Sequence, residues 1–312
     1  MTKYSRRTFG KIALAAAPLA RGSAAINSTF GGVRIGICSF SFRGFKLDDI
    51  VSQMMAVSIG ELELESLFVE PAANTLPGAL ADAPAGGRGA LSPEQRNALR
   101  RWRLSVPLDE FQAVRKKFGD SGINIYAYNI PFNDTFTEEE IDRVFQMAAA
   151  LGVRIVNAVT TLRLAPRLVA PSAKYQMRVG FHPTGGGGRG AAPNPDAIGA
   201  PESWRKVVAL APNFGVNPDL GALATGVPDP LAFLREMHDR LTTIHTHERR
   251  TEAPAGPAKF GEGNMPIREI LLMIRKEKYT FVPMIERTSH PDGTANVDDL
   301  RASVEYCKGV LL

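Results

Sequence analysis

Short apolar segments alternate with helix-like segments from residue 33 to the end of the chain, and this rhythm restricts the fold more than any other feature of the sequence. Such alternation is typical of parallel strands joined by crossover helices. The predicted strands are Val33–Ser39, Glu61–Leu64, Ile123–Tyr128, Ile155–Val159, Met177–Phe181, Phe214–Asn217, Thr242–Thr246 and Phe281–Ile285. Because eight parallel strands can close on themselves, the sequence predicts an α/β protein consisting of a single-domain (β/α)₈ barrel, or TIM barrel.

The segments between these strands carry helix signals. Thr137 precedes three glutamates, which supply a hydroxyl cap and negative charge at the positive end of a helix dipole. The predicted helices are Leu47–Ala56, Pro107–Phe118, Glu138–Leu151, Pro166–Tyr175, Glu202–Leu210, Pro230–His238, Pro266–Lys276 and Val297–Val310. Residues 70–106 and 183–201, rich in Pro and Gly, break this rhythm, and residues 70–106 are predicted as a long loop with short helical turns. Both follow strand ends, where a barrel builds its active site, and the run Gly185–Gly188 favours a lid or an insert.

The first 25 residues differ from the rest in charge and composition. Residues 5–11, Ser-Arg-Arg-Thr-Phe-Gly-Lys, resemble the twin-arginine export motif and precede a short apolar run. We interpret residues 1–25 as an export signal and residues 30–312 as the barrel domain, with an ordinary amphipathic helix as the alternative for the signal. The run is shorter than the roughly 20 residues that a membrane span needs. The interpretation predicts a periplasmic or extracellular protein with no stable membrane span.

The net charge of +5 comes from the same segment, which has five Lys or Arg residues and no acid. The mature chain would therefore be neutral overall. A nucleic-acid-binding protein needs a basic surface to contact phosphates, so we expect no nucleic-acid partner. Cys38 and Cys307 are too few for a disulfide framework, and either a single bridge or two separate buried thiols are compatible with the sequence.

Four of the predicted strands end in a side chain that can bind a metal ion. These residues are His182, Asp219, His245 and Glu286. Imidazole and carboxylate ligands suit Mn²⁺, Zn²⁺, Co²⁺ or Fe²⁺. Each residue taken singly is better explained as a hydrogen-bonded structural group. A barrel brings the carboxyl ends of its strands together, however, so four such ends in succession predict a divalent-metal site.

From about Val33 to Leu312 the chain resembles the xylose isomerase-like, or sugar phosphate isomerase/epimerase, family of (β/α)₈ barrels. The matching segments are Ile35–Arg43, Ala150–Val153, Val179–His182, Val216–Gly221, His238–Arg240, Ile244–Arg249, Gly261–Gly263 and Ile285–Glu286. The resemblance implies a divalent metal held by His182, Asp219, His245 and Glu286, and a small carbohydrate as substrate. A homo-oligomer is compatible with it.

Three positions depart from the family pattern. His182 stands where many members have Glu, Ala222 stands where a histidine is common, and His247-Glu248 replaces a Lys-Asp pair. Family isomerases move a proton on a carbon next to a carbonyl, using two carboxylates as acid and base. With His182 in place of one of these, Glu286 is the candidate base, and His247 or Glu248 is the candidate second acid or base.

Three functions therefore stay open: a metal-dependent sugar isomerase or epimerase, a metal-dependent lyase that eliminates from keto-sugars or 3-keto-glycosides, and a catalytically degraded barrel that only binds carbohydrate. Elimination needs only a single base, which supports the lyase. The loss of a histidine at Ala222 supports the catalytically degraded barrel. Glu63, Asn129 and Asn133 lie near the ends of strands two and three and are candidate substrate contacts. The alternatives are an ion pair of Glu63 with Arg43 and loop capping by the two asparagines.

Overall fold

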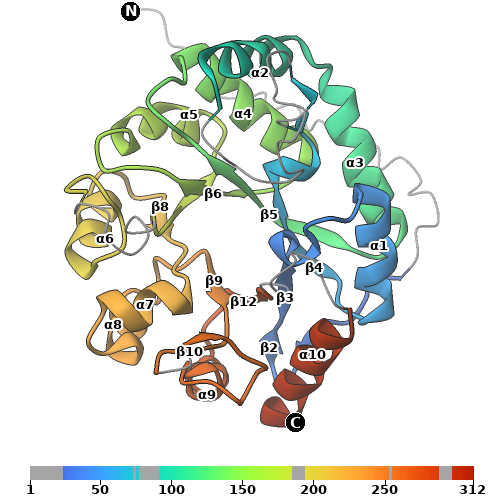
Figure 1. Ribbon diagram of the computed structural model, residues 1–312, viewed down its shortest axis with the longest axis vertical. Helices are drawn as coiled ribbons and strands as arrows, with labels where there is room; N and C mark the ends of the chain where they lie inside the picture. Colours follow the sequence, from blue (N-terminus) through green and yellow to red (C-terminus); the bar gives the residue numbers. More distant parts are fainter. Residues whose placement is uncertain (1–23, 73–74, 77–90, 185–193, 253–254, 288–296) are drawn as a thin grey trace, which may run out of the picture.

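Eight parallel strands form the central sheet of the computed structural model (Figure 1). The strands are β3 (Gly36–Cys38), β4 (Glu61–Glu65), β5 (Asn124–Pro131), β6 (Ile155–Val159), β7 (Arg178–His182), β8 (Phe214–Val216), β9 (Thr243–Thr246) and β12 (Val282–Ile285). They pair in the order β8-β7-β6-β5-β4-β3-β12-β9. Isolated parallel bridges, Val216 to Leu241 and Asp219 to His245, connect the two ends of this order. The predicted (β/α)₈ barrel is confirmed, and each strand overlaps a predicted one.

The structure describes residues 24–72, 75–76, 91–184, 194–252, 255–287 and 297–312. Residues 1–23 of the predicted export signal and the run Gly185–Gly188 lie outside the described residues. None of the helices in the described part of the chain is long and apolar enough to cross a membrane.

Helices surround the sheet in Figure 1. Those that match predicted helices are α1 (Leu47–Ala56), α3 (Leu108–Asp120), α4 (Glu138–Leu151), α5 (Val169–Lys174), α6 (Pro201–Val208), α8 (Pro230–Glu236), α9 (Ile267–Glu277) and α10 (Val297–Leu311). Helix α4 begins as its sequence indicates, because the Thr137 side chain accepts a hydrogen bond from the Glu140 amide at 3.1 Å. Val144, Phe145 and Ala148 on its inner face are fully buried, so the core lies between this helix and the sheet.

Helix α2 (Pro93–Ser105) corrects the prediction that residues 70–106 form a long loop. Ser92 and Gln95 make a capping box, with bonds of 3.2 and 2.8 Å, and Pro93 opens the first turn. The start signal is present in the sequence, but four arginines are interspersed among the apolar residues of the helix. A second unpredicted helix, α7 (Leu220–Gly226), begins directly after Asp219.

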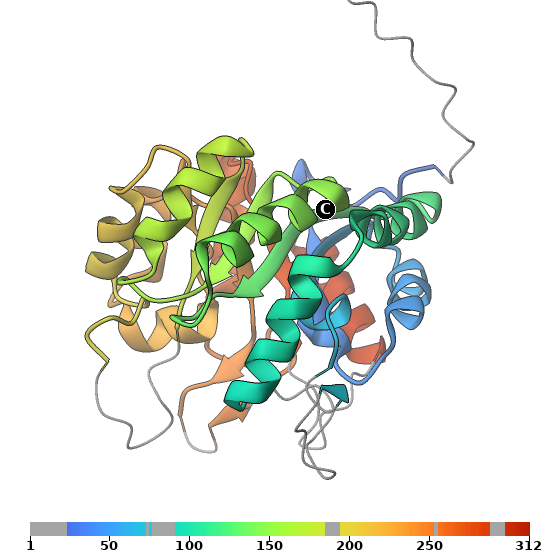
Figure 2. The ribbon, with the colours of Figure 1, turned by 90° about the horizontal axis from the view of Figure 1, so that it is seen from above.

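The amino end of the barrel carries a short antiparallel hairpin, β1 (Thr29–Phe30) and β2 (Val33–Arg34). Gly31 in its turn has φ 54°, and a Cβ there would lie 2.3 Å from the Leu311 carbonyl oxygen, so the turn needs glycine. The chain passes from β2 into β3, which places the hairpin opposite the loops that follow the strands (Figure 2).

The two cysteines are separate, buried thiols. Cys38 ends β3, and Cys307 lies in α10. Of the two possibilities that the sequence left open, the structure has free thiols and not a bridge.

Candidate metal centre

The four predicted metal ligands lie together at the carboxyl end of the barrel. His182 ends β7, His245 lies in β9, and Glu286 directly follows β12. Nδ1 of His245 lies 3.2 Å from Nε2 of His182 and 2.8 Å from Oε2 of Glu286. Asp219 joins them, because one ligand atom each from Asp219, His245 and Glu286 lie within 4.8 Å of one another.

Hydrogen bonds on the far side of each imidazole decide which nitrogen faces this cluster. Nδ1 of His182 lies 3.0 Å from the Pro183 carbonyl oxygen, which can only accept, so Nδ1 carries the proton and Nε2 a lone pair. Nε2 of His245 lies 2.9 Å from a Glu63 carboxylate oxygen. In the neutral ring Nε2 therefore carries the proton and Nδ1 the lone pair.

Two nitrogen lone pairs and a carboxylate oxygen thus face one another, and a cation is the group that stabilises such an arrangement. Ligand atoms about 2.1 Å from a tetrahedral ion are roughly 3.4 Å apart, close to the spacing between the two imidazole nitrogens. The donor set of two imidazoles and two carboxylates suits a divalent metal. The residues present therefore fit the implied ion.

Without a metal, a second proton on His245 can take the place of the cation. Burial lowers the pKa of His245, but the Glu63 carboxylate opposes this effect, and the pKa ends well above its usual value. Burial also lowers the pKa of His182, as does the neighbouring His245. The metal-free centre would therefore hold its extra proton on His245, between the carboxylates of Glu63 and Glu286.

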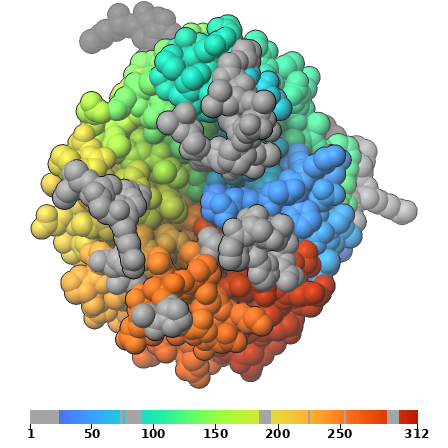
Figure 3. Space-filling model, in the orientation of Figure 1, coloured from blue at the N-terminus to red at the C-terminus, as the bar shows by residue number. Residues whose placement is uncertain are grey.

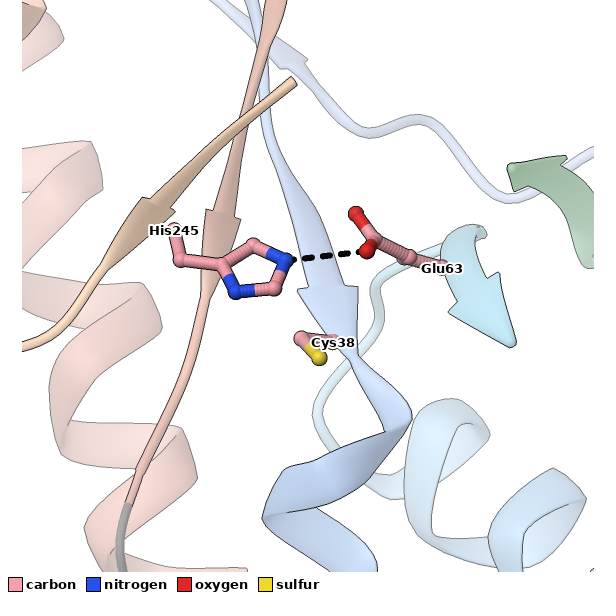
Figure 4. A group of neighbouring side chains, drawn as sticks. All are labelled: Cys38, Glu63 and His245. Carbon is pink, nitrogen blue, oxygen red and sulfur yellow. Dashed lines mark hydrogen bonds and ion pairs between the residues drawn. The ribbon is translucent and has the colours of Figure 1, made fainter. Parts of the chain in front are cut away.

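The Glu63 carboxylate faces Nε2 of the His245 ring, as Figure 4 shows. Its side chain is fully buried, and its oxygens also accept hydrogen bonds from Asn129 Nδ2 at 2.9 Å and Thr243 Oγ1 at 3.0 Å. Burial raises the pKa of Glu63, but His245 and the amide of Asn129 lower it to about 2, so the group stays ionised. With no exposed surface in this structure, Glu63 is placed to orient the imidazole, and the substrate contact predicted for it stays a prediction.

Cys38 completes a second group of potential ligands with Glu63 and His245 (Figure 4). Burial raises the pKa of the Cys38 thiol well above its usual value, which keeps the sulfur protonated. Glu63 already accepts several hydrogen bonds. The cluster around Nδ1 of His245 is therefore the better metal site, and Cys38 packs beneath it.

A layer of polar side chains fills the barrel interior below the cluster. Thr242 donates to Asn157 at 2.9 Å, and the Asn157 amide donates to Thr243 at 2.8 Å. Gly180 in β7 makes room for them, because a Cβ there would lie 2.0 Å from Thr242 Oγ1 and 2.3 Å from Asn157 Oδ1. Sequence reasoning did not find these residues, although polar side chains within apolar strands were the available signal.

Asp219 and His247 lie next to each other beside the cluster. Asp219 Oδ1 accepts the Ala222 amide at 2.9 Å and so caps α7, while its Oδ2 lies 4.0 Å from Nδ1 of His247. The His247 side chain is 15% exposed, so part of the ring is accessible. This placement is compatible with the acid or base role predicted for His247, which stays a prediction.

Glu248, predicted as a second acid or base, is held by backbone amides, and its catalytic role stays a prediction. The residue is 1% exposed, and its carboxylate accepts the backbone amides of Arg249, Gly261 and Met265 at 3.2, 3.0 and 3.0 Å. Each of these bonds stabilises the loop that leads from β9 to α9. The carboxylate is therefore committed to hydrogen bonds within this loop.

The two asparagines occupy different positions. Asn129 is 1% exposed and donates to Glu63, whereas its Oδ1 has no hydrogen-bond partner among the described residues. Asn133 is exposed, and its Oδ1 accepts from the amide and hydroxyl of Thr135 at 2.9 and 2.6 Å, which is the loop capping considered as the alternative. Substrate contact by either residue stays a prediction.

No family model and no curated protein matches the sequence, but solved structures match its fold. A sugar phosphate isomerase/epimerase from Parabacteroides distasonis matches with TM-score 0.59 and 12% identity over 94% of this chain and 99% of its own. The 3-keto-D-glucoside 4-epimerase YcjR from E. coli matches with TM-score 0.57 and 12% identity, over 89% of this chain and 99% of its own. The IolI protein, solved with a bound zinc atom, matches with TM-score 0.59 and 12% identity, over 89% of this chain and 97% of its own. The chain thus shares the barrel fold of xylose isomerase-like and sugar phosphate isomerase/epimerase proteins.

Proposed function

We propose that the protein is a divalent-metal-dependent sugar isomerase or epimerase that moves a proton next to a carbonyl of a small carbohydrate. The observation that carries this proposal is the approach of two imidazole nitrogens, Nε2 of His182 and Nδ1 of His245, which lie 3.2 Å apart. The Glu286 carboxylate lies 2.8 Å from Nδ1 of His245. Structural neighbours named as an isomerase/epimerase, a keto-glucoside epimerase and a zinc-containing barrel support it.

His182, Asp219, His245 and Glu286 would hold the ion, as Mn²⁺, Zn²⁺, Co²⁺ or Fe²⁺. When bound, the metal would polarise a substrate oxygen and acidify the neighbouring C–H. Burial raises the pKa of Glu286, but the hydrogen bond with His245 lowers it below the usual value, so the carboxylate is ionised and can accept a proton. His247, partly exposed beside Asp219, would return a proton or hold it at Nδ1 or Nε2.

A lyase is the second candidate, and the position of Glu248 favours it. Because the Glu248 carboxylate is committed to backbone amides, Glu286 is the one carboxylate of the predicted catalytic set left to act as base. One base suffices to remove a proton next to a carbonyl, after which the electron pair expels the group on the adjacent carbon. The E. coli neighbour is named for a keto-glucoside, a substrate type that allows such elimination.

Metal analysis of the purified protein tests the site. We expect about one divalent ion per chain, and Asp219→Asn should lower its affinity at least tenfold. Asp229→Asn is the matched control, because Asp229 also caps a helix, accepting the Ala232 amide at 2.9 Å, but lies outside the cluster. A metal-free wild type, or equal affinity in both variants, would contradict the proposal.

Incubation with free ketoses and 3-keto-glycosides in D₂O separates the reactions. Deuterium incorporation with an isomeric product supports the isomerase, whereas release of the aglycone with no isomer supports the lyase. Sugar binding with neither change would establish the degraded, carbohydrate-binding barrel in place of both enzymes.

A further inference from the structure

A cavity of about 880 Å³ lies at the carboxyl ends of β3, β4 and β5. Its walls come from the turn after β3, the segment after β4, helix α2 and the loop after β5. Figure 3 looks onto this face, with the blue segment after β3 and the teal helix α2 near each other. Because the metal cluster also lies at strand carboxyl ends, the cavity and the cluster open on the same face of the barrel.

Hydrogen bonds attach the cavity wall to the cluster. Ser41 Oγ accepts the Arg287 amide at 2.9 Å and donates to the Ile285 carbonyl oxygen at 3.4 Å. Ile285 and Arg287 are the two neighbours of Glu286 in the chain. Two residues beyond Ser41, Arg43 begins the cavity wall. The wall is thus fixed to the backbone on both sides of a predicted metal ligand.

The cavity has both apolar and charged walls. Large apolar side chains line it, among them Phe45, Leu47, Phe68, Leu76, Leu99 and Phe136. Buried Arg103 makes two 2.7 Å contacts with Glu70 and one of 2.6 Å with Glu140. These pairs join α2 to α4 and to the segment after β4, and they neutralise charge within the wall. The charge of Arg103 is thereby balanced within the wall, and its ion pairs hold α2 against α4.

Arg43, two residues after Ser41, supplies a polar group to the cavity wall. Its guanidinium lies 3.9 Å from the centre of the Phe40 ring, which holds the side chain in place. Its buried Nε has no hydrogen-bond partner among the described residues. A ligand oxygen that bridges the cluster and the cavity would satisfy this donor.

We propose that this cavity is a subsite for a bulky apolar substituent of the sugar, so that the substrate is a glycoside with an aromatic aglycone. The cavity is near the upper end of the roughly 300–1,000 Å³ found for small-molecule sites, far more than a single sugar ring fills. The apolar part of the wall, which includes Phe45, Phe68 and Phe136, suits an aromatic ring. The inference rests on the proposed function for the sugar end of the substrate.

Calorimetric titration with phenyl and methyl β-glucosides tests the subsite in both the metal-free and the metal-loaded protein. The phenyl glycoside should bind at least about tenfold more tightly than the methyl glycoside in both forms, because its ring adds contacts that need no metal. Equal affinities, or no measurable binding of either glycoside, would overturn the proposal.

Phe68→Ala should remove most of this preference while leaving binding of the methyl glycoside unchanged. Phe30→Ala is the matched control, because Phe30 is also partly buried against the core but lies in the hairpin at the opposite end of the barrel. If both variants keep the phenyl preference, the aromatic ring binds elsewhere and the proposal fails. Metal analysis tests the proposed function separately. If the protein binds no metal but still prefers the phenyl glycoside, the proposed metal-dependent function is contradicted and the subsite proposal stands.

Discussion

The Glu63 carboxylate lies 2.9 Å from Nε2 of His245, and this contact determines which ring nitrogen faces His182 and Glu286. The two residues come from β4 and β9, and the bond joins opposite parts of the barrel. By accepting the Nε2 proton, Glu63 leaves Nδ1 to meet His182 and Glu286.

Glu63→Gln should therefore weaken metal binding about 10- to 100-fold, because a neutral amide is a weaker acceptor and can also offer a donor to the ring. Glu61→Gln is the matched control, since Glu61 lies in the same strand but contacts Asn124 and Arg34. Titration calorimetry, or the absorption spectrum of bound Co²⁺, gives the comparison. Unchanged affinity and spectrum in Glu63→Gln would show that the carboxylate does not orient His245.

Metal binding should release a proton and strengthen as the pH rises. In the metal-free protein burial lowers the pKa of His245, but Glu63 raises it well above the usual value, so the ion must displace a proton from Nδ1. Below that raised pKa, each added proton competes with the metal, and affinity falls as the pH falls. Calorimetry in buffers of different ionisation enthalpy measures the released protons. Affinity that does not change between about pH 6 and 8 would contradict this exchange.

Gly180→Ala should destabilise the barrel by about 1–3 kcal/mol, because its Cβ would overlap Thr242 and Asn157 and disturb their hydrogen bond. Gly119→Ala in α3 is the control. A Cβ there meets nothing within 4 Å, and alanine favours helix, so that change should be neutral or stabilising. Urea unfolding measures both, and a Gly180→Ala protein as stable as wild type would show that the polar layer can shift freely.

We also propose that residues 1–25 direct export by the twin-arginine route to the periplasm or beyond. Replacing Arg6 and Arg7 together with lysine should leave the full-length chain inside the cell, because the motif is read through its paired arginines. Arg21→Lys keeps the same charge outside the motif and serves as the control. Cell fractionation with immunodetection decides the matter, and export of the double variant at the wild-type level would count against the signal.

Local patterns were sufficient to predict most of the fold. The alternation of apolar strands with capped helices predicts all eight strands, because burial on both faces and helix capping leave signals within a few residues. Helix α2 was missed although Ser92 and Gln95 carry its capping box, since its arginines hide the apolar face. In the structure those arginines, Arg103 above all, form buried ion pairs with other segments.

The candidate site, like the fold, was predicted from the sequence only in part. The sequence by itself determined that His182, Asp219, His245 and Glu286 come at strand ends, and a closed barrel brings such ends together. Only the tertiary structure decided that Glu63 faces His245 and that Glu248 binds loop amides. Those roles depend on the register and direction of strands and loops distant in sequence, and a shift of one residue in β4 would turn the Glu63 carboxylate to the opposite face.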